Sequence, residues 1–524
     1  MQEVLSERRT VKRNHPGELR EASPAPVDRR WLGAAILLSA IFLYLQVFVL
    51  PATPRVAIGD QSIYVHHGAR MLDGQLIYRD YDHFTFPGTD VIYMVLFRLF
   101  GVRAWIPQAM LIILGASTTW MIFFISGKVI SGAAVFLPGL LFVTLPFSSY
   151  LDATHHWYST LATTAALAVL LEKRSFTRLT WAGILVGMAT FFTQSLGLLV
   201  IGFGLFLLWE RRQEGQTSDF LIKQEASLLV SFLATISACL AYFVWRVGLK
   251  QFLYYTVVFV MKYYPADWFN TWRVYLTGHP QRHDWTTWFD VPAFALIHLI
   301  IPLVYILFFI TFAAKSPALS GEVRKRLMLI NLAGLFLVLS VASAPAYSRL
   351  YAVSAPALVL LVWFLHSQNL GQGGLRLLWA TVLVMAFARP MFIQLRWHAS
   401  LDLPTGRTAF FDPGAYQKFK WLSERTRPGD YFFGDQLVAF ALRLQNVSRV
   451  PFLRQTDYTR PEEVQDAIQG LEKFQVRFVN WSIGLDQARD INGNHLGPLR
   501  RYLHERYHPV QTFSEGHQIW ERNN

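Results

Sequence analysis

A series of long apolar runs constrains the fold of this chain more than any other feature. A helix needs about 20 mostly apolar residues to cross the hydrocarbon core of a bilayer. Runs of this kind lie at residues 31–50, 105–127, 132–151, 157–171, 179–193, 196–209, 226–245, 291–314, 327–344, 350–365 and 375–388. They predict an α-helical polytopic membrane protein with about eleven transmembrane helices.

The composition agrees with a membrane protein. A chain of 524 residues that is 53% hydrophobic and only 16% charged is too apolar for an ordinary soluble protein. The net charge of +13 does not indicate nucleic-acid binding, because the basic residues mostly lie between apolar runs. The single cysteine, Cys239, lies within an apolar run, which excludes a disulfide framework and a cysteine metal site.

The distribution of Lys and Arg predicts the orientation of the chain, since these residues favour cytoplasmic loops. The clusters are Arg8, Arg9, Lys12, Arg13, Arg20, Arg29 and Arg30 in the tail, then Lys173, Arg174 and Arg178, then Arg211, Arg212 and Lys223, then Lys315, Arg324, Lys325 and Arg326. All fall on one side if the short segment 87–103, broken by Arg98, lies on the membrane surface without crossing it.

This orientation predicts a multi-pass protein of the plasma (inner) membrane with three parts. Residues 1–30 form a cytoplasmic basic tail, and residues 31–391 form the transmembrane domain. Residues 392–524 form an extracytoplasmic, or periplasmic, domain because the number of spans is odd. Two long extracytoplasmic loops lie at 51–104 and 247–290, and chemistry is expected on that face.

The first of these loops contains an acidic residue in a distinctive position. Asp60 immediately precedes residues 61–72, whose apolar side chains suit a helix lying on the membrane surface, and Gly74 is expected to end that helix. From the residues alone, Asp60 is either an N-cap or a catalytic group. Within the spans, His298 is the main ionisable residue, which disfavours an ion or proton path.

The order of residues in this loop resembles the GT-C superfamily of polyprenyl-phosphate-sugar-dependent glycosyltransferases. That superfamily includes the protein O-mannosyltransferases, the aminoarabinose transferases and the lipopolysaccharide-core transferases. The residues that carry the resemblance are Asp60, Tyr64, Ala69, Gly74, Tyr78, Asp80, Pro87 and Phe100-Gly101. The chain departs from the pattern at Asp60-Gln61, where many members have two adjacent acids, and at Pro87-Gly88, where many have two prolines.

The resemblance implies an inverting glycosyltransferase of the cell envelope. It would move a sugar from a polyprenyl-phosphate donor, held at the membrane lipid, to a glycan, lipid or protein acceptor, with Asp60 as the general base. Arg349 and Tyr351 resemble the start of a late span in the family, where a guanidinium group suits phosphate oxygens, although Arg349 could instead snorkel to the interface. The other residues expected to bind substrate are Tyr78, Asp80, Asp82, His83 and Lys262.

A divalent metal is a further expectation. Asp152, His155 and His156 lie in the outer loop between the third and fourth spans, with His66, His67 and His83 on the same face. His and Asp are common ligands of divalent ions, and some relatives bind a metal while others need none. The alternative is that these residues anchor a helix end at the interface. Arg273 and the Trp-rich stretch around it could either line a sugar groove or form an interfacial aromatic belt; the tryptophans are Trp268, Trp272, Trp285 and Trp288.

The C-terminal part alternates between helical and strand patterns. Helices are expected at 416–425, after Asp412-Pro413, from Arg460-Pro461 onward, and at 500–507, and strands at 431–434, 476–481 and 518–521. This predicts a small α/β domain that caps the membrane site or helps to hold an acceptor. Two other functions stay open, a flippase or transporter of lipid-linked glycans and a non-enzymatic envelope-assembly protein, and neither depends on Asp60.

Overall fold

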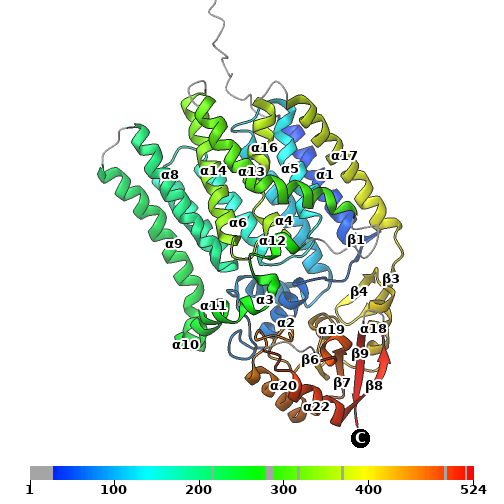
Figure 1. Cartoon of the computed structure of the whole chain (residues 1–524). Coiled ribbons are helices and arrows are strands. Elements are labelled where there is room, and N and C mark those ends of the chain that lie inside the picture. The colour runs from blue at the N-terminus through cyan, green and yellow to red at the C-terminus, as the bar shows by residue number, and fades with distance from the viewer. Residues whose placement is uncertain are drawn as a thin grey trace, which may run out of the picture.

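The structure is a computed structural model that describes residues 28–214, 218–278, 288–315, 319–367, 371–488, 493–513 and 516–523. The predictions for residues 1–27 of the basic tail and for Trp285 lie outside the described residues. Figure 1 shows a bundle of long helices at one end of the molecule and the C-terminal domain at the other.

Helices occupy all of the apolar runs. They are α1 (Arg29–Val47), α4 (Trp105–Ser126), η1–α5–η2 (Gly132–Phe136, Leu137–Phe142, Val143–Phe147), α6 (His155–Leu170), α7 (Phe176–Phe192), η3–α8 (Gln194–Leu198, Leu199–Glu214), α9 (Ser218–Val247), α13 (Val291–Lys315), α14 (Gly321–Val341), α15–α16 (Tyr347–Ala352, Ala355–Ser367) and α17 (Gln372–Leu395). Among the described residues, 6 helices are long and apolar enough to cross a membrane and 3 more are shorter and apolar. The polytopic fold is confirmed, and the count of eleven spans stays a prediction.

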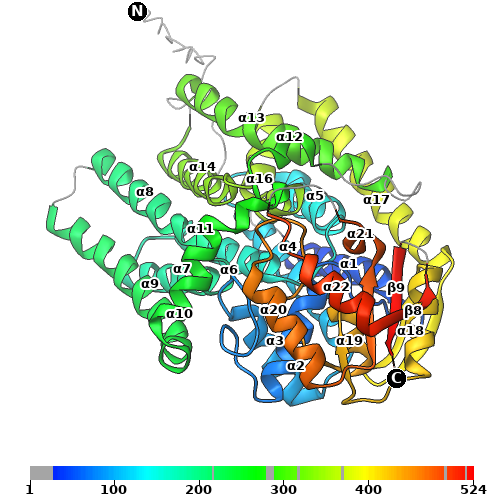
Figure 2. The ribbon, with the colours of Figure 1, turned by 60° about the horizontal axis from the view of Figure 1, so that its bottom comes forward.

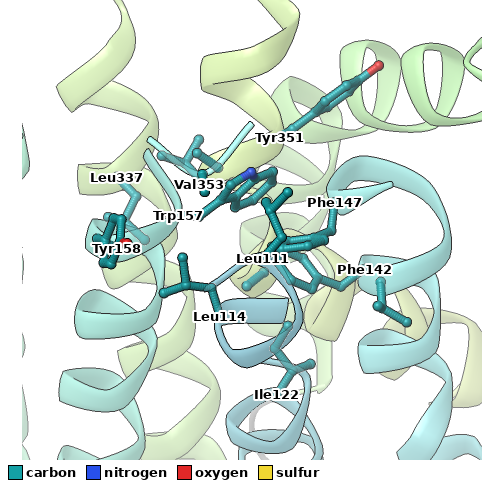
Figure 3. Packing of buried hydrophobic residues seen from close by; sticks show 14 of the residues in the cluster. Leu111, Leu114, Ile122, Phe142, Phe147, Trp157, Tyr158, Leu337, Tyr351 and Val353 are labelled. Carbon is teal, nitrogen blue, oxygen red and sulfur yellow. The ribbon is translucent and has the colours of Figure 1, made fainter. Parts of the chain in front are cut away.

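The packing around Trp157 shows how the bundle positions an outer loop. Trp157 is 1% exposed, and its ring centroid lies 5.8 Å from that of Phe142 and 4.5 Å from that of Phe147 (Figure 3). Its indole Nε1–H donates to the carbonyl oxygen of Tyr150 at 2.8 Å. Burying a large aromatic ring stabilises this corner and fixes the short connection between η2 and α6, which contains Asp152.

Two amphipathic helices, α2 (Gln61–Leu72) and α3 (Gly88–Phe100), lie between the bundle and the C-terminal domain (Figure 1). The helix α2 has the predicted bounds, and Gly74 follows its end with a φ of +89°. The two helices approach closely at Gly68, where an added Cβ would lie 2.5 Å from the Cβ of Tyr93. With 13 residues, α3 is shorter than a span, as predicted for segment 87–103.

The second outer loop contains only short elements in its described part. They are α10 (Leu249–Leu253), η4 (Tyr254–Phe259), α11 (Val260–Lys262), η5 (Tyr264–Ala266), η6 (Trp268–Asn270) and α12 (Val274–Thr277). Figure 2 shows α10 beside α9, and Arg460, which precedes the C-terminal helix α20 (Pro461–Lys473), donates to the hydroxyl oxygen of Tyr254 in η4. The loop therefore reaches from the bundle toward the C-terminal domain.

The C-terminal domain is a small α/β unit with its own buried core, as predicted. Its main sheet has the order β6-β5-β7-β9-β8, with parallel pairing around β5 and antiparallel pairing around β9. The strands are β5 (Tyr431–Phe433), β6 (Gln445–Asn446), β7 (Phe478–Ser482), β8 (Tyr507–Thr512) and β9 (His517–Arg522), and the helices besides α20 are α18 (Pro413–Ser423), α19 (Gln436–Leu442), α21 (Ile483–Asp486) and α22 (Gly497–Arg506).

Two short antiparallel pairs connect this domain to the membrane part. The pair β3 (Ala399–Leu403) and β4 (Gly406–Phe410) follows α17, and the pair β1 (Phe48–Val49) and β2 (Thr53–Pro54) follows α1. The N–H of Val56 donates to the carbonyl oxygen of Ala409 at 2.9 Å, and α19 packs against α2. The C-terminal domain therefore docks directly on the first outer loop, which places it above the helix that follows Asp60.

Candidate functional site

A cavity of about 1090 Å³ lies between the C-terminal domain and the ends of the bundle helices that face it. From the membrane part it is lined by residues that include Asp60, Tyr64, His83, Phe84, His155, His156, Tyr264, Trp268, Asn270 and Arg349. From the C-terminal domain it is lined by residues that include Gln436, Arg454, Gln455, Asn480, Trp481 and His517. Asp60 and Arg349, which are 289 positions apart in the chain, therefore face one space.

Asp60 does not cap α2. Its backbone is helical (φ −67°, ψ −18°), and its side chain makes no capping hydrogen bond. The residue is exposed to the cavity, while its backbone N–H donates to Oδ2 of Asp152 at 3.0 Å. Of the two alternatives that the sequence left open, the capping role is therefore not realised, and the carboxylate is accessible to a ligand.

Glycine at position 59 permits the close approach of the two acids. Gly59 has a φ of +59°, and an added Cβ would lie 2.5 Å from Oδ2 of Asp152. A left-handed backbone conformation is costly for residues with a side chain. Both the conformation and the contact therefore require glycine here, and together they hold Asp152 against the backbone that precedes α2.

Desolvation and neighbouring charges shift the pKa values of both Asp60 and Asp152. Asp60 is exposed only to the cavity between the two domains, so desolvation there raises its pKa, and the positive charges of Arg349 and Arg454 lower it. Burial also raises the pKa of Asp152 well above its usual value, and the negative charge of Asp60 raises it further. Neighbouring carboxyl groups with raised pKa values can accept and release a proton, which suits general acid–base catalysis.

Two arginines supply positive charge from opposite walls of the cavity. The guanidinium of Arg349 donates to the carbonyl oxygen of Ala344 at 2.8 Å, to Oη of Tyr264 at 2.6 Å and to Oδ1 of Asn270 at 3.1 Å. These bonds hold the side chain in the protein, so Arg349 does not have the free geometry of a snorkelling residue. Guanidinium groups suit the oxygens of phosphate.

The second arginine, Arg454, belongs to the C-terminal domain. Its Nε donates to Oδ2 of Asp267 at 3.0 Å, and its side chain is 51% exposed. Its guanidinium lies 4.8 Å from the ring centroid of Phe452. Arg454, Tyr264 and Asn270 were not predicted as site residues, because no local pattern in the sequence indicates that they meet Arg349 or Asp60.

A hydrogen-bonded chain of side chains follows the floor of the cavity. Oη of Tyr64 lies 2.6 Å from Nδ1 of His155 and 3.3 Å from Oγ1 of Thr85, which lies 2.7 Å from Nδ1 of His83. The chain connects α2, the segment before α3 and the start of α6. Such a network fixes the orientation of the groups that line the cavity.

Five predicted substrate-binding residues do not line the cavity that the described residues form; they are Tyr78, Asp80, Asp82, Lys262 and Tyr351. Tyr78 is buried and its hydroxyl donates to the carbonyl oxygen of Thr85 at 2.5 Å. Asp80 forms an ion pair with Arg79 at 2.7 Å. Lys262 is exposed, with Nζ 5.0 Å from the ring centroid of Tyr263, and Tyr351 is 1% exposed beside Tyr347.

Asp82 instead joins the first outer loop to the C-terminal domain. Its Oδ1 accepts from the hydroxyl of Tyr255 at 2.5 Å and from Nη2 of Arg449 at 3.0 Å. Its Oδ2 lies 3.6 Å from Nη2 of Arg460, and its side chain is 7% exposed. A buried carboxylate with two arginines is costly to break, so this cluster holds the domain that forms one wall of the cavity.

The predicted metal ligands Asp152, His155 and His156 are close together in the chain but have other partners. Oδ2 of Asp152 accepts the Asp60 N–H, Nδ1 of His155 bonds Tyr64, and the rings of His155 and His156 lie 4.0 Å apart. Within the described residues, the group of His, Cys, Asp or Glu side chains whose ligand atoms all lie within 4.8 Å of one another is a different one, His67, His83 and Asp90.

Comparisons with known proteins identify the fold. No protein-family model matches the chain. No curated protein sequence matches it either. Among solved structures, ArnT from Cupriavidus metallidurans bound to undecaprenyl phosphate is similar, with a TM-score of 0.60, 12% sequence identity, and coverage of 94% of this chain and 97% of that chain.

Two further solved structures are similar to this chain over most of its length. The oligosaccharyltransferase AglB from Archaeoglobus fulgidus, in complex with an inhibitory peptide and a dolichol-phosphate, has a TM-score of 0.51 at 11% identity, covering 95% of this chain and 74% of that chain. The arabinofuranosyltransferase AftD from Mycobacteria has a TM-score of 0.50 at 12% identity, covering 96% of this chain and 42% of that chain. The chain therefore has the GT-C fold that its sequence resembles.

Proposed function

We propose that this multi-pass membrane protein transfers a sugar from a polyprenyl-phosphate donor to an acceptor, by an inverting mechanism on the extracytoplasmic face. The observation that carries the proposal is the cavity in which the uncapped Asp60 carboxylate faces the same space as Arg349 and Arg454. An acid without a structural bond, beside two cations, is an arrangement for moving a proton while an anion departs.

The chemistry follows from the charges. A hydroxyl or amine of the acceptor attacks the anomeric carbon, and Asp60 accepts the proton that this group releases. The bond between the anomeric carbon and the phosphate oxygen breaks, and the electron pair leaves with the lipid phosphate. Arg349 and Arg454 stabilise the negative charge on that phosphate. A single displacement of this kind inverts the anomeric configuration.

The solved structures support the class of donor. ArnT is bound to undecaprenyl phosphate and AglB is in complex with a dolichol-phosphate, and both have the fold of this chain. A polyprenyl chain stays in the bilayer while its phosphate reaches the surface. The cavity lies at the ends of the helices, so a phosphate could meet Arg349 there without extraction of the lipid from the membrane.

The ion pairs of the basic loops support the proposed orientation. Lys325, at the start of α14, contacts Glu214 and lies 3.8 Å from Glu210, both at the end of α8, and Arg174 also bonds Glu210. These helix ends lie at the end of the bundle opposite the C-terminal domain (Figure 1). Because basic loops favour the cytoplasm, the cavity is proposed to face outward.

The test compares two carboxylates at opposite ends of α2. Asp60→Asn removes the proposed base, while Asp73→Asn changes an acid whose side chain is 56% exposed at the other end of the helix. Purified wild type and both variants are incubated with a radiolabelled polyprenyl-phosphate sugar, and release of the lipid phosphate is followed. General-base catalysis contributes about 10²–10⁴-fold, so Asp60→Asn should lose activity on that scale while Asp73→Asn keeps it.

Two outcomes would contradict the proposal. Equal turnover by wild type and Asp60→Asn would remove this carboxylate from the mechanism. Movement of intact donor across proteoliposome membranes by both proteins, without release of the lipid phosphate, would instead identify a transporter of lipid-linked glycans.

A further inference from the structure

A buried cluster of possible metal ligands lies beneath α2, beside the cavity. His67 lies on α2, His83 in the segment that follows it, and Asp90 in the first turn of α3. They are 1%, 5% and 0% exposed, respectively. One ligand atom from each lies within 4.8 Å of the others. Three elements that are separate in the chain therefore bring two imidazoles and a carboxylate to one point.

Only one of the two carboxylate oxygens of Asp90 has a hydrogen-bond partner among the described residues. Its Oδ1 lies 3.1 Å from Nδ1 of His67, which is a normal hydrogen bond. Its Oδ2 is buried and has no hydrogen-bond partner. A buried polar atom without a partner costs roughly 1–3 kcal/mol, and more when it is charged. An Asp–His pair alone does not explain this arrangement, whereas a cation against Oδ2 does.

The surroundings of Asp90 favour a metal ion over a proton. A buried carboxylate oxygen without a protein partner is stabilised either by a proton or by a metal ion. A proton on Oδ2 would itself be a buried donor that needs an acceptor.

The distances suit a small divalent ion. Zinc binds His nitrogen and carboxylate oxygen at about 2.0–2.2 Å in tetrahedral geometry, which places neighbouring ligand atoms about 3.4 Å apart. Nδ1 of His67 and Oδ1 of Asp90 already lie 3.1 Å apart, and one ligand atom from each of the three residues lies within 4.8 Å of the others, so side-chain rotation can bring them to these distances. Two imidazoles and one carboxylate form a ligand set that zinc accepts, and the fourth tetrahedral position would hold a water or another small ligand.

We propose that His67, His83 and Asp90 bind one zinc ion that ties α2 to α3 and to the segment between them. The site does not include Asp152, His155 or His156, although His83 also lines the cavity. The effect of the metal is to stabilise the first outer loop, since metal binding that requires the folded ligands adds directly to folding stability.

The test measures metal content rather than activity. Wild type is equilibrated with zinc, passed over a desalting column that contains a weak chelator, and measured by inductively coupled plasma mass spectrometry. About one zinc per chain is expected for wild type, and less than about a tenth of that for His67→Gln and for Asp90→Ala. The matched control is His66→Gln, which changes a neighbouring histidine of α2 that is 3% exposed and outside the cluster, and which should keep its zinc.

Two results would overturn the proposal. If wild type that has been equilibrated with zinc retains none, then Asp90 is protonated or contacts a buried water and the proposed site does not bind zinc. Zinc retained equally by His67→Gln and Asp90→Ala would place the ion elsewhere on the surface. If those variants do not fold, X-ray absorption of zinc-loaded wild type still decides, because a spectrum without imidazole ligands contradicts the site. None of these readings depends on sugar transfer.

Discussion

Gly59 offers a sharp test of how the two acids are held together. Replacing it with alanine adds one methyl group at a position with a φ of +59°, 2.5 Å from Oδ2 of Asp152. That oxygen accepts the Asp60 N–H at 3.0 Å, so it cannot move away without loss of the bond. The matched control is Gly74→Ala, at a φ of +89° with no atom within 4 Å of the new methyl group.

The free energies of unfolding of the two variants should differ by the cost of losing the hydrogen bond from the Asp60 N–H to Oδ2 of Asp152. A left-handed conformation costs an alanine roughly 1–2 kcal/mol, and both variants have this cost. Gly59→Ala also breaks a charge-assisted hydrogen bond, worth roughly 1.5–3 kcal/mol. We therefore expect Gly59→Ala to lower the free energy of unfolding by about 2.5–5 kcal/mol and Gly74→Ala by about 1–2 kcal/mol.

Activity should separate the two variants further. A displacement of about 1 Å at a catalytic group can cost about 10²-fold in rate, so Gly59→Ala should lose donor turnover on that scale while Gly74→Ala keeps most of it. Stability is measured by chemical denaturation in detergent micelles, and turnover by release of lipid phosphate. If Gly59→Ala is as stable and as active as Gly74→Ala, then Asp152 is not packed against the Asp60 backbone and the site geometry is wrong.

Three further predictions follow from the same contacts. Asp82→Asn removes one carboxylate from Arg449 and Arg460, which keep Asp466 and Glu463 as partners, so unfolding should become easier by roughly 1–3 kcal/mol. Limited proteolysis should then release the C-terminal domain more readily, and wild-type protease resistance would contradict this. Arg349→Gln removes a positive charge that lowers the pKa of Asp60, so the acidic limb of the pH profile of kcat/KM should move to higher pH. If the acidic limb does not move, Arg349 does not influence the ionisation of the catalytic base. Because the pKa of Asp152 is raised in the folded protein, its ionisation costs stability as the pH rises above about 4. Asp152→Asn should therefore make the melting temperature depend less on pH, and the melting temperature near neutral pH should be higher than that of wild type. An unchanged pH dependence would contradict the effect of burial on Asp152.

Local patterns allowed much of the fold to be predicted from the sequence. The helix α2 has the expected bounds, since its first residue follows Asp60 and a glycine with positive φ follows its end. Asp412 caps α18 as expected, with Oδ1 accepting from the N–H of Ala415 at 2.5 Å. The predicted strands of the C-terminal domain form β5, β7 and β9. These signals depend on neighbouring residues in the chain, so they need no tertiary information.

The site was less predictable because its members come together only in the folded chain. Asp60 and Arg349 were identified by a resemblance, and both line the cavity. Asp82, like Asp60, is an acidic residue of the loop at 51–104, but it forms ion pairs with Arg449 and Arg460 of the C-terminal domain. Arg454 lies in an unremarkable loop, and only the docking of the C-terminal domain brings it to the cavity. Long-range packing of this kind leaves no local periodicity in the sequence.

Ser62 provides the most direct measurement of the central claim, which is that the cavity beside Asp60 faces outward and binds a lipid phosphate. Ser62 lines the cavity in the first turn of α2, and Cys239 is the single cysteine of the chain. In a Cys239→Ala background, Ser62→Cys is treated with a membrane-impermeant maleimide in intact cells. We expect labelling from outside, and protection of the purified protein by polyprenyl phosphate. Labelling only after the membrane is opened, or no protection by the lipid, would contradict the account.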